Sequence, residues 1–463
     1  MATRRERRNM YPGWVCIVLV AGCGGPKLKR PTRPLILAVS GDTQGWIVPC
    51  GCASHQSGGL LRRGTLLAQL GPDVDVIYVD VGGAPDGIAP YDQLKFEAIL
   101  KGELISGLDA HNIGTGEARL GADYLRALKA RLKVPLVSCN VRDEAGKFVG
   151  DPFRIAGGSG WRIGLIGVLS DRKQIAGVVI DSALDSILAA IGAAAGQYDS
   201  LVVLAYMPED ELVQLAENLP EVDVIVGGPT NQSLVPRRAG PVLLASATNK
   251  GKFMVLLHGS SSESGACWDG KVVELTDAFA DDSRQKDNLN DFRALLAQRN
   301  FTPAQTSFTA TIPAPLPDDV RVAGTESCVG CHVEDARIWR ASKHARAWRS
   351  LMQTGAEVDP YCQQCHTTGY GLPGGFRSVR VPARRVAVGC ESCHGPSRAH
   401  AEHPEHPTAW RGQAKHQCRR CHDHENSPRF EFDAYWDQIR HGASPAGPTT
   451  AGKRVNEPER SRS

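Results

Sequence analysis

A CxxCH motif occurs four times in the C-terminal part of this chain, and no other feature restricts the possible folds as strongly. The motifs comprise Cys328, Cys331 and His332; Cys362, Cys365 and His366; Cys390, Cys393 and His394; and Cys418, Cys421 and His422. Of the 14 cysteines and 14 histidines, 8 and 11 follow residue 322, whereas Leu, Ile and Val become rare there. A segment so poor in aliphatic side chains cannot build an ordinary hydrophobic core. Another group must therefore fill the interior of residues 322–442.

The spacing of the motif predicts covalently bound haem c. Two thiols add to the vinyl groups of one haem, and the adjacent histidine supplies an axial nitrogen to the iron. A zinc site is the alternative for a single motif, but zinc needs thiolates grouped in tetrahedral sets and gives no reason for a histidine after every pair. We therefore expect four haem c groups with His332, His366, His394 and His422 as proximal ligands. Their porphyrins supply the missing apolar bulk.

Seven further histidines are candidates for the second axial position of each iron. They are His344, His400, His403, His406, His416, His424 and His441. The stretches CVGCHVEDARIWRASKHARAW, GCESCHGPSRAH and CRRCHDHENSPRFEFDAYWDQIRHG resemble the tetrahaem cytochromes c that take electrons from hydroxylamine oxidoreductase. The resemblance covers about residues 322–442. It implies distal ligands at His344, His400 and His441, and closely stacked haems with mainly two histidine ligands each.

One distal position stays open after this assignment. It could be filled by His403, His406, His416 or Met352, or by no protein ligand. The polar surroundings of His403, His406 and His424 favour solvated over ligating side chains.

From Leu35 to about Asp269, short runs rich in Val, Ile and Leu alternate with amphipathic helical patterns. Continuous apolar runs such as LILAVS and SLVVLAYM predict strands that are buried on both faces. This part of the chain therefore predicts an α/β domain. A helix is expected in the polar segment 277–300, and the Pro-rich TIPAPLPDDV behind it predicts a linker.

The order of motifs in this first domain resembles the calcineurin-like metallophosphoesterases, in particular the 5′-nucleotidase and UDP-sugar hydrolase family. SGDTQG, SGGLLRRG, NIGTGEARLGADYL, VSCNV and VDVIVGGPTN follow in the family's order. The resemblance implies a four-layer α-β-β-α sandwich over residues 35–275. It also implies a site for two divalent metals, which such enzymes use to polarise phosphate and activate water.

Most of the metal ligands that the resemblance implies are missing. Asp42 is kept, but Gln44 stands in place of its histidine partner. The other ligand positions hold Gly83, Thr115 and Gly116, Tyr206, and Pro229 with Asn231, while Asp80 and Glu117 survive nearby. Asp42, Gln44 and Asn231 form at most a degenerate metal site with one negative charge, so a divalent metal and hydrolysis are not expected.

The loop after Asp42 carries a CxC pair, Cys50 and Cys52. The two thiols cannot easily bond to each other, so one interpretation is a disulfide to another cysteine or simple burial. The alternative is a redox or metal-binding pair beside Arg62 and Arg63, whose charges would lower a thiol pKa. The residues alone leave both open.

The extreme N-terminus predicts a lipoprotein signal peptide over residues 1–22. Four arginines precede the apolar run WVCIVLVAG, which is too short to span a bilayer and ends at Cys23 in a pattern that resembles the bacterial lipobox. The alternative is an ordinary cleaved signal. Residues 23–34 then form a tether, and the chain is expected to be exported to the periplasm and anchored to the cell envelope by lipid.

These patterns together predict six segments: the signal peptide, the tether, the phosphoesterase-like domain 35–275, a helix and linker 276–321, a small, mostly helical tetrahaem domain 322–442, and a disordered tail 443–463. The expected function is electron transfer through four haems to redox protein partners or from a quinone-linked donor. Alternatives are a hydrolase fused to a cytochrome, and a haem- or CxC-dependent oxidoreductase. A formal net charge of +3 gives no reason to expect a nucleic-acid partner.

Overall fold

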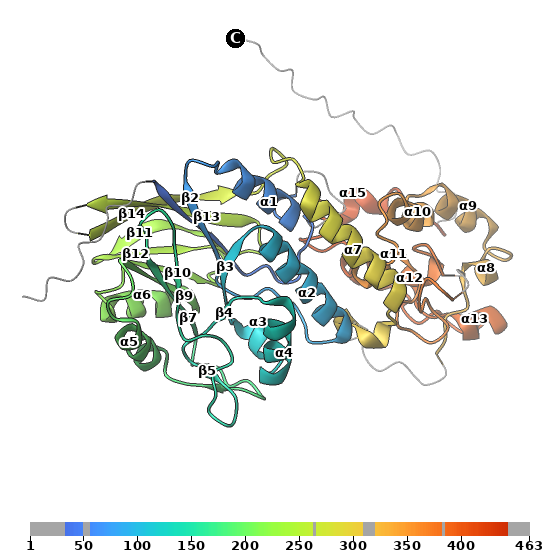
Figure 1. Ribbon diagram of the computed structural model, residues 1–463. Coiled ribbons are helices and arrows are strands. Elements are labelled where there is room, and N and C mark those ends of the chain that lie inside the picture. Colours follow the sequence, from blue (N-terminus) through green and yellow to red (C-terminus); the bar gives the residue numbers. More distant parts are fainter. Residues whose placement is uncertain (1–32, 50–55, 263–264, 309–319, 382–384, 443–463) are drawn as a thin grey trace, which may run out of the picture.

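A computed structural model of the chain describes residues 33–49, 56–262, 265–308, 320–381 and 385–442. Two β-sheets with helices on their outer faces form the N-terminal domain, and short helices without a sheet form the C-terminal domain (Figure 1). Among the described residues, no helix combines the length and the apolar character needed to cross a membrane.

The first sheet of the N-terminal domain mixes parallel and antiparallel strands. Its order is β14-β13-β1-β2-β3-β4, in which the central strands β1, β2, β3 and β4 run parallel and β13 joins β1 antiparallel. The bounds are β1 Leu35–Ser40, β2 Asp75–Asp80, β3 Leu108–Asn112, β4 Leu136–Val137, β13 Phe253–Ser262 and β14 Gly265–Glu274. The carboxyl ends of β1, β2 and β3 therefore meet at one edge, where Asp42, Asp80 and Glu117 follow in the chain.

The second sheet has the order β11-β12-β10-β9-β7-β6. Its strands are β6 Arg154–Ala156, β7 Ile163–Leu169, β9 Ser200–Tyr206, β10 Val224–Gly228, β11 Leu234–Ala239 and β12 Val242–Ser246, and a separate small ribbon pairs β5 Val141–Arg142 with β8 Val179–Ile180. The core strands β7, β9, β10 and β12 are parallel to one another.

Three hydrophobic layers hold these sheets and helices together. Alternate residues of β1 divide between two of them: Leu35 and Leu37 lie between the sheets, whereas Ile36 packs under the outer helices. The outer helices of the first sheet are α1 Leu60–Gln69, α2 Pro90–Ile105, α3 Thr115–Ala118, α4 Ala122–Leu132 and α7 Ser283–Arg299; those of the second are α5 Ala183–Ala194 and α6 Glu209–Asn218. The predicted four-layer α-β-β-α sandwich is thereby confirmed.

Helix α7 belongs to this sandwich, although it follows the last strand. It begins at the N-cap Asp282, whose side chain accepts hydrogen bonds from the backbone N–H groups of Arg284 and Gln285. Phe292 and Leu296 are buried in the cluster that α1 and α2 also form. The segment expected as a helix before a linker is therefore packed on the first domain as far as residue 299.

The C-terminal domain has short helices and little aliphatic core. Its helices are α8 Thr325–Cys328, α9 Val333–Ala341, η3 His344–Arg346, α10 Ala347–Met352, α11 Pro360–His366, α12 Cys390–His394, α13 Arg398–Glu402, α14 Ala414–Arg419 and α15 Phe432–Trp436. The cluster of buried apolar side chains that lies in the described part of this domain consists of Val322, Leu372 and Trp410. The expected scarcity of hydrophobic core is a property of the folded domain as well.

The two domains meet near the loop that carries Asp42. Trp46 packs edge-on against Tyr361 of α11, with ring centroids 6.1 Å apart. Lys250 and Lys252 approach Glu425 with N–O distances of 3.0 and 3.4 Å. The C-terminal domain thus packs on one side of the loop that follows Asp42.

Candidate functional site: paired histidines and a closed metal loop

Each CxxCH motif lies on a short helix or at the end of one. The second and third motifs occupy α11 and α12, while α8 ends at Cys328 and α14 runs through Cys418. In the first and fourth motifs, the histidine N–H donates to the carbonyl of the first cysteine, at 3.0 and 2.9 Å. One helical turn thus brings both thiols and the imidazole to the same region, which is the arrangement that attachment to one porphyrin needs.

Three of the motif histidines each face one of the three histidines expected as distal ligands. The ring centroids are 6.2 Å apart for His332 and His400, 6.1 Å for His422 and His344, and 5.7 Å for His394 and His441. A histidine nitrogen binds a first-row metal at about 2 Å, so two rings on opposite sides of one ion have centres about 6 Å apart. The donor set therefore fits an iron between the rings of each pair.

Hydrogen bonds fix the orientation of these rings. The Nδ1 atoms of His400 and His441 lie 2.7 and 2.8 Å from the carbonyl oxygens of His406 and Ile439. In the motifs, Nδ1 of His366 lies 2.8 Å from the carbonyl of Ala347, and Nδ1 of His422 lies 3.0 Å from Ser427 Oγ. Such partners hold Nδ1 as the protonated nitrogen and leave Nε2 for a metal.

Burial favours the neutral form of the rings, which is the form that binds a metal. It lowers the pKa of His344, His394 and His422, and the neighbouring histidines lower the pKa of the first two further. The motifs also lie close to one another. Cys328 contacts Cys390, and Cys365 contacts Cys421, so the first motif neighbours the third and the second neighbours the fourth.

The N-terminal loop that resembles a metal site has a different geometry. The carboxylate of Asp42 accepts hydrogen bonds from Gln44 Nε2 at 2.9 Å, Tyr206 Oη at 3.2 Å, and Thr248 Oγ1 at 2.8 Å. The backbone N–H of Asn249 adds a further bond at 3.3 Å. Both carboxylate oxygens therefore face protein donors from three separate loops.

Two of the replaced ligand positions fit each other sterically. A Cβ atom at Gly83 would lie 2.5 Å from Cε2 of Tyr206, and Gly83 adopts a left-handed backbone with φ 79°. The ring of Tyr206 thus occupies the space that a side chain at position 83 would need. Glu117 fixes the same turn, because its carboxylate accepts hydrogen bonds from the N–H groups of Gly83, Ala84 and Gly114.

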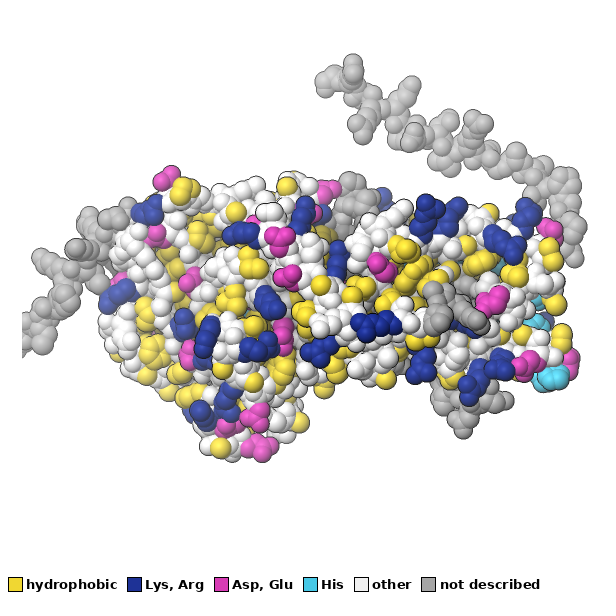
Figure 2. Space-filling model, turned by 45° about the vertical axis from the view of Figure 1, so that its right-hand side comes forward, with side chains coloured by type: hydrophobic (Ala, Val, Ile, Leu, Met, Phe, Trp, Pro, Cys, Tyr) yellow, Lys and Arg dark blue, Asp and Glu magenta, His cyan; other side chains and the backbone are white. Residues whose placement is uncertain are grey.

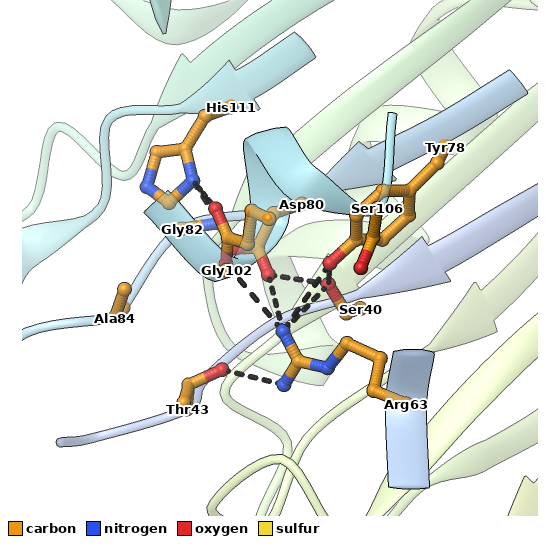
Figure 3. Close-up of polar contacts among 12 residues, drawn as sticks. Ser40, Thr43, Arg63, Tyr78, Asp80, Gly82, Ala84, Gly102, Ser106 and His111 are labelled. Carbon is orange, nitrogen blue, oxygen red and sulfur yellow. Dashed lines mark hydrogen bonds and ion pairs between the residues drawn. The ribbon is translucent and has the colours of Figure 1, made fainter. Parts of the chain in front are cut away.

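Behind this loop lies a buried charged network around Arg63 (Figure 3). The Nη1 atom of Arg63 lies 3.8 Å from Asp80 and 3.5 Å from Glu103. Figure 3 shows this guanidinium beside Asp80 and the hydroxyls of Ser40 and Tyr78. His111 bridges Glu103, at 2.8 Å, and Glu117, at 3.1 Å. All of these side chains are buried.

The network supplies its own cations. Burial raises the pKa of Glu103 to about 7. Burial lowers the pKa of His111, but the charge of Glu103 and the hydrogen bonds that the imidazole donates to both glutamates outweigh it and raise that pKa well above the ordinary value. Asp80, Glu103 and His111 lie close enough to ligate a metal ion, yet Arg63 and a protonated His111 already balance the carboxylates.

The family of the C-terminal domain follows from its sequence together with these pairs. The sequence profile described as cytochrome c554 and c-prime matches residues 327–395. Cytochrome c-554 of Nitrosomonas europaea is 31% identical over 159 residues, which cover 27% of this chain and 68% of that protein. The chain belongs to the cytochrome c554 family. Residues 320–442 are called the cytochrome domain below, and family membership supports haem c as its cofactor.

The N-terminal domain is similar in fold to calcineurin-like phosphoesterases. The 5′-nucleotidase precursor from Thermus thermophilus matches with a TM-score of 0.50 and 22% identity, covering 58% of this chain and 60% of that chain. The calcineurin-like phosphoesterase YfkN from Bacillus subtilis gives a TM-score of 0.48 and 16% identity, covering 57% of this chain and 97% of that chain. At 22% identity, the similarity to the 5′-nucleotidase precursor concerns the fold alone. The chain spans about three fifths of that protein's length.

Some residues singled out from the sequence lie elsewhere than expected, or outside the described residues. Asn231 is exposed after β10, whereas Thr248 contacts Asp42 and had not been singled out. His111 and Glu103 had also been missed, since neither stands at a ligand position of the resembled enzymes. Cys23, Cys50 and Cys52 lie outside the described residues. Met352, one candidate for the open distal position, is 60% exposed.

Proposed function

We propose that this chain is an exported, lipid-anchored tetrahaem cytochrome c that carries electrons. The observation that carries the proposal is the pairing of three motif histidines with His344, His400 and His441 at ring distances of 5.7–6.2 Å. Each pair belongs to a different CxxCH motif, so the three spacings repeat one arrangement. A fourth haem at Cys362, Cys365 and His366 completes the set.

In this proposal the residues of the cytochrome domain bind and orient, and the haem supplies the redox chemistry. The cysteines of each motif would hold the porphyrin covalently, and the histidines would coordinate the iron from both sides. Two neutral histidines favour low-spin iron with little change in structure between oxidation states. Such an iron suits electron transfer better than substrate binding.

We infer that the N-terminal domain serves as a scaffold or docking module and has no hydrolase activity. Hydrolysis by this fold class requires divalent metals held by carboxylates and histidines. Here the oxygens of Asp42 accept hydrogen bonds from protein donors, and the ring of Tyr206 fills the space beside Gly83. These contacts support a closed loop in place of a two-metal site.

The location and the partners belong to the same proposal. Cys23 would carry the lipid anchor, which would place both domains in the periplasm beside the membrane. Redox proteins or a quinone-linked donor would then exchange electrons with the haems, and nucleic acid has no role. A globomycin-sensitive mass shift at the N-terminus tests the anchor.

The haem set is tested by mass spectrometry and pyridine haemochrome analysis of the full chain. We expect four haems per chain, and a count of zero would end the proposal. The histidine pairing is tested by His400→Ala, which removes the partner of His332 and should convert one haem to a high-spin spectrum. His424→Ala is the matched control, because His424 is exposed and is not a candidate for the open distal position, and its spectrum should match the parent protein.

The role of the N-terminal domain is tested by metal analysis and by an assay on a generic phosphodiester with added Mn²⁺. We expect no stoichiometric metal after dialysis and no turnover above the buffer. Two bound metals with turnover would instead support the alternative of a hydrolase fused to a cytochrome.

A further inference from the structure

A stretch of the cytochrome domain carries a row of uncompensated positive charges. No acidic residue occurs between Asp335 and Glu357. The row consists of Arg340, Lys343, Arg346 and Arg349, which follow one another at intervals of three residues along α9, η3 and α10. All four side chains are exposed, and in the described part of the chain none of them forms an ion pair with a carboxylate.

The neighbouring arginines differ from this row. Arg337 lies 3.0 Å from Glu334, Arg398 lies 2.8 Å from Glu402, and Arg385 lies 2.8 Å from Glu326. These three arginines are thus balanced locally, whereas the cations of the row are not. Unbalanced like charges on an exposed face cost folding stability through self-repulsion and raise the potential over that face.

The row lies away from the N-terminal domain. The described residues 331–352 make no hydrogen bond, ion pair or ring contact with residues 33–308 of the N-terminal domain. That domain instead contacts other residues of the cytochrome domain, namely Asp359, Tyr361, Tyr370, Ser378, Arg380 and Glu425. Figure 1 shows α8, α9 and α13 at the end of the molecule opposite the sheets. Figure 2 shows Lys and Arg side chains on the surface of this domain. The four side chains of the row are themselves exposed, so a partner can reach them.

The row also borders two of the proposed haem sites. His344, one residue after Lys343, faces His422 of the fourth motif at 6.1 Å. Trp339 and Arg340 line a cavity of about 300 Å³ together with Thr325 and Val329, which flank Cys328 of the first motif. A molecule seated on the row would lie next to both sites.

We propose that this row is the docking surface for an acidic one-electron redox protein. The inference rests on the proposed function, since it requires haem iron behind the surface. One electron passes between a haem iron and the partner's redox centre: the reduced member becomes oxidised, the oxidised member becomes reduced, and no bond forms or breaks. The partner carries carboxylates around its redox centre, because complementary charge steers such encounters and fixes their orientation.

The row variant for the test replaces Arg340, Lys343, Arg346 and Arg349 by glutamate. A second variant with glutamine at the same positions removes the positive charges without adding negative ones, in case the first folds poorly. The control variant replaces Lys133, Lys147, Lys173 and Lys271 by glutamate; all four are exposed on the N-terminal domain and change the net charge by the same amount.

The reduced full-length holoprotein is mixed in a stopped-flow instrument with ferricyanide or with tris(phenanthroline)cobalt(III). At low ionic strength, we expect the row variant to react at least about tenfold more slowly with the anionic oxidant and faster with the cationic one, as electrostatic steering predicts. The glutamine variant should also react more slowly with the anionic oxidant and faster with the cationic one, but by smaller factors. High salt should remove the differences, because it screens exposed charges.

A reduced acidic ferredoxin serves as the protein probe with the oxidised holoprotein. Its reaction should slow with salt for the parent protein and lose most of this dependence in the row variant. If the row and control variants behave alike with all three probes, the surface is not the docking site, even though the haems transfer electrons.

Two other outcomes also overturn the proposal. If the arginines neutralise haem carboxylates instead, the row variant will show a shifted reduction potential that persists at high salt, without a change in steering. If the purified chain contains no haem, the proposed function and the docking surface fail together, and the haemochrome count distinguishes this result from the first.

Discussion

Two replaced ligand positions, Gly83 and Tyr206, act as one unit. A side chain at position 83 would collide with the Tyr206 ring and would also have to adopt a left-handed backbone. The residues at positions 83 and 206 are therefore structurally linked. Introducing a side chain at position 83 without also replacing Tyr206 should destabilise the N-terminal domain.

We expect Gly83→Asp to destabilise the N-terminal domain by about 3 kcal/mol, from overpacking and backbone strain together. Tyr206→His in the same chain should recover at least about 1 kcal/mol of this loss, because the smaller ring makes room for the new side chain. Denaturant unfolding of both single variants and the double variant measures the coupling. Strictly additive effects would contradict the steric link.

The buried pair of Glu103 and His111 makes the domain sensitive to high pH. In both residues the folded-state pKa is raised, to about 7 for Glu103 and well above the ordinary value for His111. A raised folded pKa gives stability that is complete below the unfolded pKa and is lost as pH rises through the folded value. The free energy of unfolding should therefore fall as pH rises from about 4.5 for Glu103 and from about 6.5 for His111.

His111→Gln should lower the free energy of unfolding by about 3 kcal/mol or more near pH 6, because it leaves buried carboxylates without their cation. The substitution should also reduce the fall in the free energy of unfolding between neutral and alkaline pH. Denaturant unfolding at several pH values measures both effects. His258→Gln is the control, since His258 is exposed on β13, and a loss of equal size there would argue against the network.

At the scale of elements, α7 lies beyond the point where the sequence pattern of the N-terminal domain ends, yet it packs as part of that domain. The pattern of apolar runs ends near residue 275, yet Phe292 and Leu296 complete the layer that α1 and α2 leave open. Gln285 and Asn288 add hydrogen bonds to the backbone of α2, at 2.8 and 2.9 Å. The helix therefore contributes to the stability of the sandwich.

Phe292→Ala should cost the N-terminal domain about 3–5 kcal/mol, the usual range for removing a buried aromatic side chain. Asp291→Ala, one residue earlier and exposed, should change the unfolding midpoint little. Thermal unfolding of each variant makes the comparison. Equal midpoints for the two variants would mean that α7 is only a spacer.

Continuous apolar runs such as LILAVS predicted the buried strands of an α/β domain, and the family resemblance implied the four-layer sandwich. The family resemblance also singled out His344, His400 and His441 as distal-ligand candidates. The sequence did not indicate which motif histidine each of them faces, and that pairing comes from the structure. The sequence also did not predict the hydrogen bonds around Asp42, because Thr248 stands 206 residues away in the chain. The Arg63 network was missed because Glu103 lies on α2 and His111 on β3, so only the packing of the helix on the sheet brings the two side chains together.

At the scale of the whole molecule, few but specific contacts join the two domains. Glu425 lies between Lys250 and Lys252, and Trp46 packs against Tyr361, all beside the loop of Asp42. Tyr91 adds a hydrogen bond to Asp359 at 2.7 Å. The cytochrome domain is thus fixed against the edge of the first sheet at which Asp42 lies.

Glu425→Lys should loosen this junction, since it would place three cations together. We expect several-fold faster hydrogen exchange at Trp46 and in α11, with the core strands unchanged. Glu431→Lys, an exposed change in the same domain, is the control. Unaltered exchange at the junction would mean that the aromatic contacts alone hold the domains.

The small apolar cluster of Val322, Leu372 and Trp410 has a consequence for biogenesis. A polypeptide with so little apolar surface to bury gains almost nothing from collapse, so we expect the cytochrome domain to stay unfolded until haem has been attached to its cysteines. The sandwich has its own three hydrophobic layers and can fold without a cofactor. The two halves of one chain would then mature at different times, and any cell short of haem would accumulate a half-folded protein with a protease-sensitive C-terminal end.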